Sequence, residues 1–252
     1  MLVVISPAKK LDENCDTDVI SKFTVPPYLE SSKKIIKSLR EYSANNLSKL
    51  MNTSEKISEL NYRRNIKWSL PFNRSNSLQA LLMFKGDVYK GISVTDFDKD
   101  DFLFAQKSLR ILSGLYGILK PLDLIQPYRL EMGTQLQIGK HKNLYDFWGD
   151  EITNLINNEK NNDYLINLAS VEYFKSINTS NLKSKLINVS FKEKRDGKYK
   201  IIAIYSKRAR GLMSRYIIKN KITNPINLKK FNLEDYRFNK VLSSDSDLVF
   251  TR

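Results

Sequence analysis

The stretch SLRILSGLYGILKPLDLIQPYRLEMG, residues 108–133, decides how the middle of this 252-residue chain folds. Its leucines and isoleucines favour burial, and they lead into a turn that contains Gly114 and Gly117. Glycine lets the backbone reach positive φ or approach another group closely. We expect an apolar helix end, a two-glycine turn and a connector containing proline. Two interpretations of the turn stay open: a helix cap between two core helices, or a set of free backbone N–H groups that binds an anion such as phosphate.

Hydrophobic patterning around this stretch predicts alternating strands and helices. Short apolar runs predict strands at residues 2–5 and 164–168, and the first ends in the polar loop Ser6-Pro7-Ala8-Lys9. Apolar residues recur at helical spacing over residues 28–42, 54–68, 75–82, 100–112 and 144–157, which predicts helices there. A further helix is expected to start near Ser170. Residues 83–92 predict a strand and a turn that presents Tyr89. Because no linker or repeat divides residues 1–252, the fold class is a single compact mixed α/β domain.

The second half of the chain contains a strongly basic block. Residues 183–230 include fifteen basic and two acidic residues, in a chain whose formal net charge is +15. Strands over residues 185–191 and 198–205 flank Asp196-Gly197, which favours a tight hairpin. A helix over residues 206–221 has basic side chains opposite an apolar stripe, and Gly211 within it indicates a kink or a close backbone approach. Residues 235–241 and 248–251 predict a closing hairpin.

Composition excludes several classes of function. With one cysteine, Cys15, and one histidine, His141, the chain has no internal disulfide and no His/Cys metal cluster, so we expect no metal and no cofactor. No segment approaches the ~20 apolar residues of a membrane span, and the start lacks a signal-peptide pattern. We therefore expect a cytoplasmic protein with no membrane partner. A Walker A loop, a GxGxxG fingerprint and a Ser–His triad are also missing.

The basic block indicates a polyanionic partner. Clustered positive charge attracts polyanions, and nucleic acid is the commonest one in a cytoplasm. Arg208, Arg210 and Arg215 can chelate phosphate through two N–H groups each, whereas Lys207 acts as a point charge. The alternative is an ordinary solvated helix, because Lys, Asn and Ile are abundant throughout, as an AT-rich genome would produce.

Three short polar motifs allow an alternative, enzymatic function. Arg129 and Glu131 lie two residues apart, so on a strand both would point to one face and could pair. With Lys9, Tyr89 and Arg210 they would form the polar centre of an enzyme acting on nucleic acid or a phosphorylated substrate. Convergence of these side chains in one pocket would favour chemistry, and scatter over separate faces would count against it.

Seven motifs of the chain form a recognisable set: ISPAK (5–9), FKGDVYKG (84–91), LSGLYGILKPLDLIQPYRLEM (112–132), LYDFWGD (144–150), NLASVEYFK (167–175), KRARGLMSR (207–215) and LVFTR (248–252). This set resembles the YaaA family of bacterial peroxide stress proteins. The resemblance implies a compact mixed α/β fold with a basic cleft. It also implies a helix-hairpin-helix element, which we map to residues 113–119. Two residues separate its glycines where a usual turn of this kind has one, so we expect a variant hairpin.

On this resemblance the expected function is sequence-tolerant binding of duplex or branched DNA during peroxide stress. Backbone and phosphate contacts position DNA without specifying sequence. The expected DNA-binding and phosphate-binding residues are Arg110, Gly114, Gly117, Lys120, Lys207, Arg208, Arg210 and Arg215. Limitation of free iron is a further route to protection, although one His and one Cys give direct iron storage little support.

Overall fold

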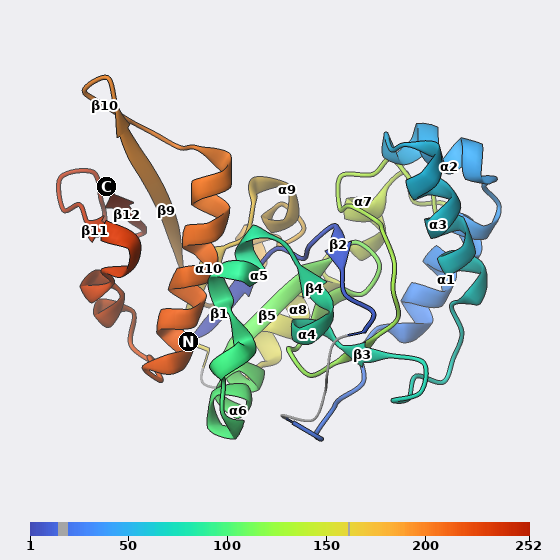
Figure 1. Cartoon of the computed structure of the whole chain (residues 1–252), viewed down its shortest axis with the longest axis horizontal. Helices are drawn as coiled ribbons and strands as arrows, with labels where there is room; N and C mark the ends of the chain where they lie inside the picture. The colour runs from blue at the N-terminus through green and yellow to red at the C-terminus, as the bar shows by residue number, and fades with distance from the viewer. Residues whose placement is uncertain (15–19, 161) are drawn as a thin grey trace.

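The centre of the molecule is a twisted, mainly parallel sheet. A computed structural model describes residues 1–14, 20–160 and 162–252, and Cys15 lies outside these ranges. The sheet runs in the order β11 (Arg237–Phe238), β12 (Asp247–Thr251), β9 (Lys185–Arg195), β8 (Tyr164–Leu168), β1 (Leu2–Ile5), β5 (Leu109–Ser113) and β6 (Gly117–Leu119). The strands from β12 to β5 are mutually parallel, whereas β11 and β6 add antiparallel edges (Figure 1).

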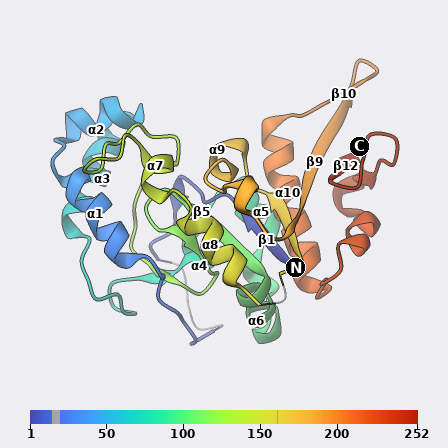
Figure 2. The same ribbon diagram turned by 180° about the vertical axis from the view of Figure 1, so that it is seen from behind.

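Helices cover both faces of this sheet. They are α1 (Leu29–Arg40), α2 (Ala44–Met51), α3 (Glu55–Lys67), α4 (Ala80–Met83), α5 (Asp87–Ile92), α6 (Lys99–Ser108), α7 (Leu144–Trp148), α8 (Glu151–Asn158), α9 (Val171–Phe174) and α10 (Ala203–Lys219). α5 and α10 lie on one face and α8 on the other, while α1, α2 and α3 group at one end (Figures 1 and 2). Within the described ranges, no helix combines the length and the apolar character that crossing a membrane requires.

The remaining strands are short. β2 (Lys10–Leu11) pairs with β4 (Phe84–Lys85), β3 (Leu78–Gln79) pairs with β7 (Leu124–Ile125), and β10 (Lys198–Lys200) pairs with β9. β2–β4 and β3–β7 join segments that are far apart in the chain, whereas β10 forms a hairpin with β9.

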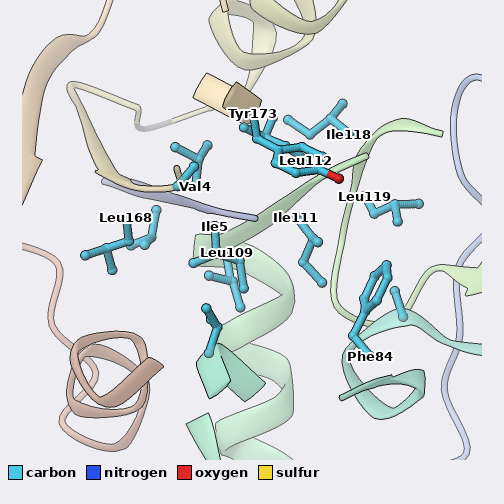
Figure 3. Packing of buried hydrophobic residues seen from close by; sticks show 14 of the residues in the cluster. Val4, Ile5, Phe84, Leu109, Ile111, Leu112, Ile118, Leu119, Leu168 and Tyr173 are labelled. Atoms are coloured by element: carbon cyan, nitrogen blue, oxygen red, sulfur yellow. The ribbon is translucent and has the colours of Figure 1, made fainter. Parts of the chain in front are cut away.

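β1 and β5 form the most deeply buried part of the core. All four residues of β1 and all five of β5 are buried; β1 is entirely apolar, whereas β5 also contains Arg110 and Ser113. The apolar run of β1 is typical of a parallel strand covered on both faces. Figure 3 shows Val4, Ile5 and Ile111 packed among neighbouring aliphatic side chains, with Tyr173 of α9 lying over the core.

Most of the predicted elements are confirmed. The structure contains the strands at residues 2–5 and 164–168, the helices near 28–42 and 54–68, the start of α9, the Asp196-Gly197 turn, the basic helix and the closing β11–β12 hairpin. The predicted strand over 198–205 is wrong beyond Lys200, because α10 begins at Ala203. The predicted helix over 75–82 is wrong, because β3 occupies its middle before α4 begins. The region 144–157 divides into α7 and α8, since Gly149 has a φ of +45°. Tyr89 lies in α5 and not in a turn.

The stretch 108–133 differs most from its prediction. The expected helix over 100–112 ends at Ser108, and a β5–β6 hairpin stands in place of the expected helix-hairpin-helix element. The reason is tertiary: β5 is the parallel partner of β1, with Val3 opposite Leu109, and backbone pairing inside the core overrides local helix preference. Gly117, with a φ of +70°, packs against the Trp148 ring.

A close approach between α5 and α10 explains the glycine in the basic helix. A Cβ atom at Gly211 would lie 1.9 Å from the Val88 carbonyl oxygen, and one at Gly91 would lie 2.3 Å from the Arg208 carbonyl oxygen. The predicted close backbone approach at Gly211 is therefore confirmed. The two glycines let the helix backbones touch directly.

We predict that Gly211→Ala lowers the free energy of unfolding by about 3 kcal/mol, because neither backbone can withdraw from the added methyl group without repacking. Equilibrium unfolding in urea measures this loss. Gly139→Ala is the matched control, since nothing lies within 4 Å of its Cβ position and only its φ of +56° opposes alanine. That control should cost about 1 kcal/mol, and an equal cost at both positions would contradict the packing argument.

Candidate functional site

The ends of three parallel strands bring polar residues to one side of the sheet, which we call the carboxyl edge. Ser6 follows β1, Ser113 ends β5, and Ser170 follows β8. The Ser6 hydroxyl donates to the Ser170 hydroxyl at 3.2 Å and accepts the Ser170 backbone N–H at 2.9 Å. The loops after β1 and β8 are thus tied together, at the edge where α/β proteins commonly bind ligands.

Three buried tyrosines line the inside of this edge. Tyr89 of α5 donates its hydroxyl hydrogen to the Ser6 carbonyl oxygen at 3.1 Å, and the Tyr128 and Ser113 hydroxyls lie 2.7 Å apart. Burial raises the pKa values of Tyr89, Tyr128 and Tyr173 above the usual range of a phenol. All three phenols therefore stay protonated at neutral pH and can serve as hydrogen-bond donors.

A carboxylate between two cations completes the site. Glu131 lies 2.6 Å from the Lys9 ammonium nitrogen and 3.1 Å from Arg129 Nη2. Lys9 is exposed, whereas Arg129 is mostly buried and its Nε has no hydrogen-bond partner in the described part of the chain. We call Lys9, Tyr89, Arg129 and Glu131 the polar centre. Ion pairs join Lys9, Arg129 and Glu131, and Tyr89 is linked to them through its hydrogen bond to Ser6, in the loop that leads to Lys9.

Arg210, the fifth member of the predicted enzyme site, lies on α10. Its Nε is buried without a hydrogen-bond partner among the described residues, and burial lowers its pKa. No hydrogen bond within the described ranges joins it to the other four residues. Glu172, whose Oε1 accepts the Gly133 N–H at 3.0 Å, was not among the residues predicted from the sequence. The available signal was its place in the block 167–175, at the start of the helix expected near Ser170.

An open hollow lies beside the polar centre at the start of α5. Its volume is about 1170 Å³, and Tyr89 lines it together with Lys10, Lys85, Lys90 and Arg208. Asp12, Glu13 and Asp87 also line it, so the hollow has mixed charge. Tyr89 therefore connects the loop after β1 with a surface that solutes can reach.

The structure places the expected phosphate site of the β5–β6 hairpin inside the protein. Arg110 is 1% exposed, its Nη2 lies 2.6 Å from Glu159 Oε1, and it donates to the Gln106 and Leu109 carbonyl oxygens. The Lys120 ammonium nitrogen lies 3.3 Å from the same Glu159 oxygen.

The glycines of this hairpin are also enclosed. The Trp148 indole N–H donates to the Gly114 carbonyl oxygen at 3.0 Å, and a Cβ at Gly114 would lie 2.6 Å from the Leu130 carbonyl oxygen. Gly114 and Gly117 thus serve close packing. Arg110, Gly114 and Gly117 are buried and therefore present no exposed N–H groups to a phosphate, whereas the Lys120 side chain is 39% exposed.

Carboxylates neutralise much of the basic helix. Arg208 lies 2.6 Å from Glu234, and Arg215 lies 2.5 Å from Asp96. Lys219 lies 2.8 Å from Asp101. Lys207, by contrast, is exposed and has no ion-pair partner among the described residues. The predicted basic face of α10 is therefore partly a structural ion-pair network.

We predict that Arg215→Met destabilises the protein at neutral pH and has less effect in acid. The hydrogen bond from Arg215 lowers the pKa of the Asp96 carboxyl group. A depressed carboxyl pKa adds stability above the ordinary Asp pKa of about 3.9, and this stability is lost as the pH falls through the native pKa. Urea unfolding at pH 7 and at pH 3 measures the difference. Lys207→Met is the control and should change stability little at either pH.

Exposed cations without partners gather on the β9–β10 hairpin. Lys194, Arg195, Lys198 and Lys200 are all exposed, and none of them forms an ion pair with a carboxylate among the described residues. They lie on the antiparallel ribbon that β9 and β10 form within the basic block. These side chains can meet an external anion without first losing an internal partner.

The fold and the site define a mixed α/β protein with a polar centre at the carboxyl edge of its sheet. A family model described as peroxide stress protein YaaA matches residues 1–242. A UPF0246 protein of Acaryochloris marina is 51% identical over 253 residues, which cover 100% of both chains. Another, from Neisseria meningitidis serogroup A, is 49% identical over 255 residues, covering 100% of this chain and 98% of the relative. The chain belongs to the YaaA family of peroxide stress proteins.

Proposed function

We propose that this protein binds duplex or branched DNA, without sequence preference, as part of the response to peroxide stress. Family membership supports the stress context. The observation that supports DNA binding is the set of exposed cations without internal partners: Lys194, Arg195, Lys198, Lys200 and Lys207. Because phosphate contacts supply most sequence-independent affinity, such a set favours the backbone of nucleic acid.

The DNA-binding surface proposed here follows the carboxyl edge. β9 is parallel to β8 and β1, so its carboxyl end and the β9–β10 hairpin extend beyond the same edge as the polar centre. We infer that the basic cleft expected for the family is located there. Bound DNA would be shielded from hydroxyl radicals, and limitation of free iron would be a separate route to the same protection.

We predict a strong dependence of DNA affinity on salt. Five phosphate contacts would give a slope of roughly −4 to −5 in a plot of log K against log salt concentration for duplex DNA. Mobility-shift titrations at several salt concentrations, with duplex and four-way-junction DNA of equal length, measure this slope. A flat dependence, or no shift at low salt, would contradict the proposed function. Peroxide survival of cells carrying a non-binding variant then separates DNA shielding from iron limitation.

The polar centre supports a second candidate function, which is the binding and turnover of a phosphorylated small substrate. Glu131 balances only one of its two neighbouring cations, and the Arg129 Nε has no hydrogen-bond partner among the described residues. An anionic group with several oxygens could accept from Arg129 and from Lys9. The position at the ends of β1 and β8 agrees with this function.

For this second function we predict stabilisation of the protein by pyrophosphate. A ligand at one hundred times its Kd adds about 2.7 kcal/mol, which raises the Tm of a chain of this size by roughly 5 to 10 °C. Thermal unfolding with and without pyrophosphate measures the shift. Arg129→Gln should abolish the shift and Lys34→Gln, on α1, should retain it. An unchanged shift in Arg129→Gln would show that the anion binds elsewhere.

A further inference from the structure

The β9–β10 hairpin is a two-stranded ribbon that stands outside the main sheet. The register between β12 and β9 ends with Thr251 opposite Lys192, and the last hydrogen bond is donated by the Lys194 N–H to the Arg252 carbonyl oxygen. Beyond this point β9 pairs only with β10 in the described structure. Figures 1 and 2 show the ribbon rising clear of the body of the protein. We call residues 193–201 the arm.

The turn of the arm is well defined. Asp196 and Gly197 have φ values of 51° and 73°. Two consecutive positive φ angles are characteristic of the primed two-residue turn, whose twist matches that of its strands. The arm therefore presents its side chains in a fixed register.

That register places like charges opposite each other. Arg195 faces Lys198, and like charges directly across an antiparallel pair are destabilising. Lys200 faces Glu193, but the Glu193 carboxylate already binds Arg252, at 3.0 Å, and the Tyr236 hydroxyl. Arg195, Lys198 and Lys200 thus form a cationic face that no described carboxylate neutralises. An external polyanion would remove the repulsion.

The opposite face of the arm offers a different set of groups. Lys194 faces Tyr199, which is 39% exposed, and Ile201 just beyond β10 is 58% exposed. An exposed aromatic ring and an exposed isoleucine between cations suit contact with sugars and base edges better than contact with water.

We propose that the arm inserts edge-on into the major groove of duplex DNA, with Arg195, Lys198 and Lys200 directed at one phosphate backbone and Lys194 and Tyr199, on the opposite face, at the other wall of the groove. This inference rests on the proposed function. A ribbon with large side chains on both faces is about 10 Å thick, judged from the spacing of packed sheets. The major groove of B-DNA is about 12 Å wide and admits such a ribbon, whereas the minor groove is about 6 Å wide.

The first test compares two variants that each remove three positive charges. The arm variant is Arg195→Gln/Lys198→Gln/Lys200→Gln, and the control is Lys34→Gln/Lys37→Gln/Lys49→Gln, on exposed positions of α1 and α2. The arm variant should lower the magnitude of the salt slope by roughly 2 to 3, because each phosphate contact contributes about 0.9. The control should change it by less than about 1. Equal slopes for the arm variant and the unsubstituted protein would overturn the inference and leave DNA binding intact.

A second variant separates binding from folding. Lys198→Glu converts the repulsive pair with Arg195 into an attractive one, so it should raise the Tm while DNA binding weakens. A purely structural role of the arm predicts that stability and affinity change together, and that result would contradict the inference.

The third test identifies the groove. Bound protein should protect guanine N7, which faces the major groove, from methylation, and the arm variant should lose this protection. Duplex RNA of equal length and charge should compete weakly, since its major groove is too deep and narrow for a ribbon. Equal competition by duplex RNA, or protection of the minor groove alone, would overturn groove insertion. No binding of any duplex by the unsubstituted protein would overturn both this inference and the proposed function.

Discussion

The parallel alignment of β1 with both of its neighbours determines where chemistry and binding can occur in this protein. β1 consists of four buried residues that hydrogen-bond to β5 on one side and β8 on the other. Because all three strands run in one direction, the residues that follow them meet at the carboxyl edge. The same direction continues into β9, so the arm extends from this edge as well. A short apolar strand thus organises segments that lie far apart in the sequence.

Close contact between α5 and α10 links the polar centre to the basic block. Gly91 and Gly211 bring the two helix backbones together, which fixes Tyr89 beneath the loop after β1. α10 also lies beside Glu234 and Asp96, which neutralise Arg208 and Arg215. Charge along the basic block is consequently divided between cations that stabilise the fold and cations that remain available on the arm.

The polar centre and the arm are suited to different partners. The polar centre combines one carboxylate, a mostly buried arginine, an exposed lysine and the Tyr89 phenol, and such a compact set is suited to a small anion recognised through directed hydrogen bonds. The arm presents exposed cations in a row, an arrangement suited to a long polyanion. Since both features lie at one edge, a nucleic acid held by the arm would pass close to the polar centre. This shared edge is the reason to test DNA binding and small-anion binding on the same surface.

The sequence by itself determined the class of fold, the apolar strands, the Asp196-Gly197 turn and the excess of positive charge, because each depends on local patterning or on composition. It also identified Lys9, Tyr89, Arg129 and Glu131, although not the contacts between them. Only the tertiary structure decided that residues 109–119 form a β-hairpin, since pairing of β5 with β1 overrides their helical preference. It alone decided which cations are neutralised, because Glu159, Glu234 and Asp96 come from segments distant in the chain. Which carboxylate pairs with a given cation depends on long-range packing, and no local sequence pattern encodes that packing.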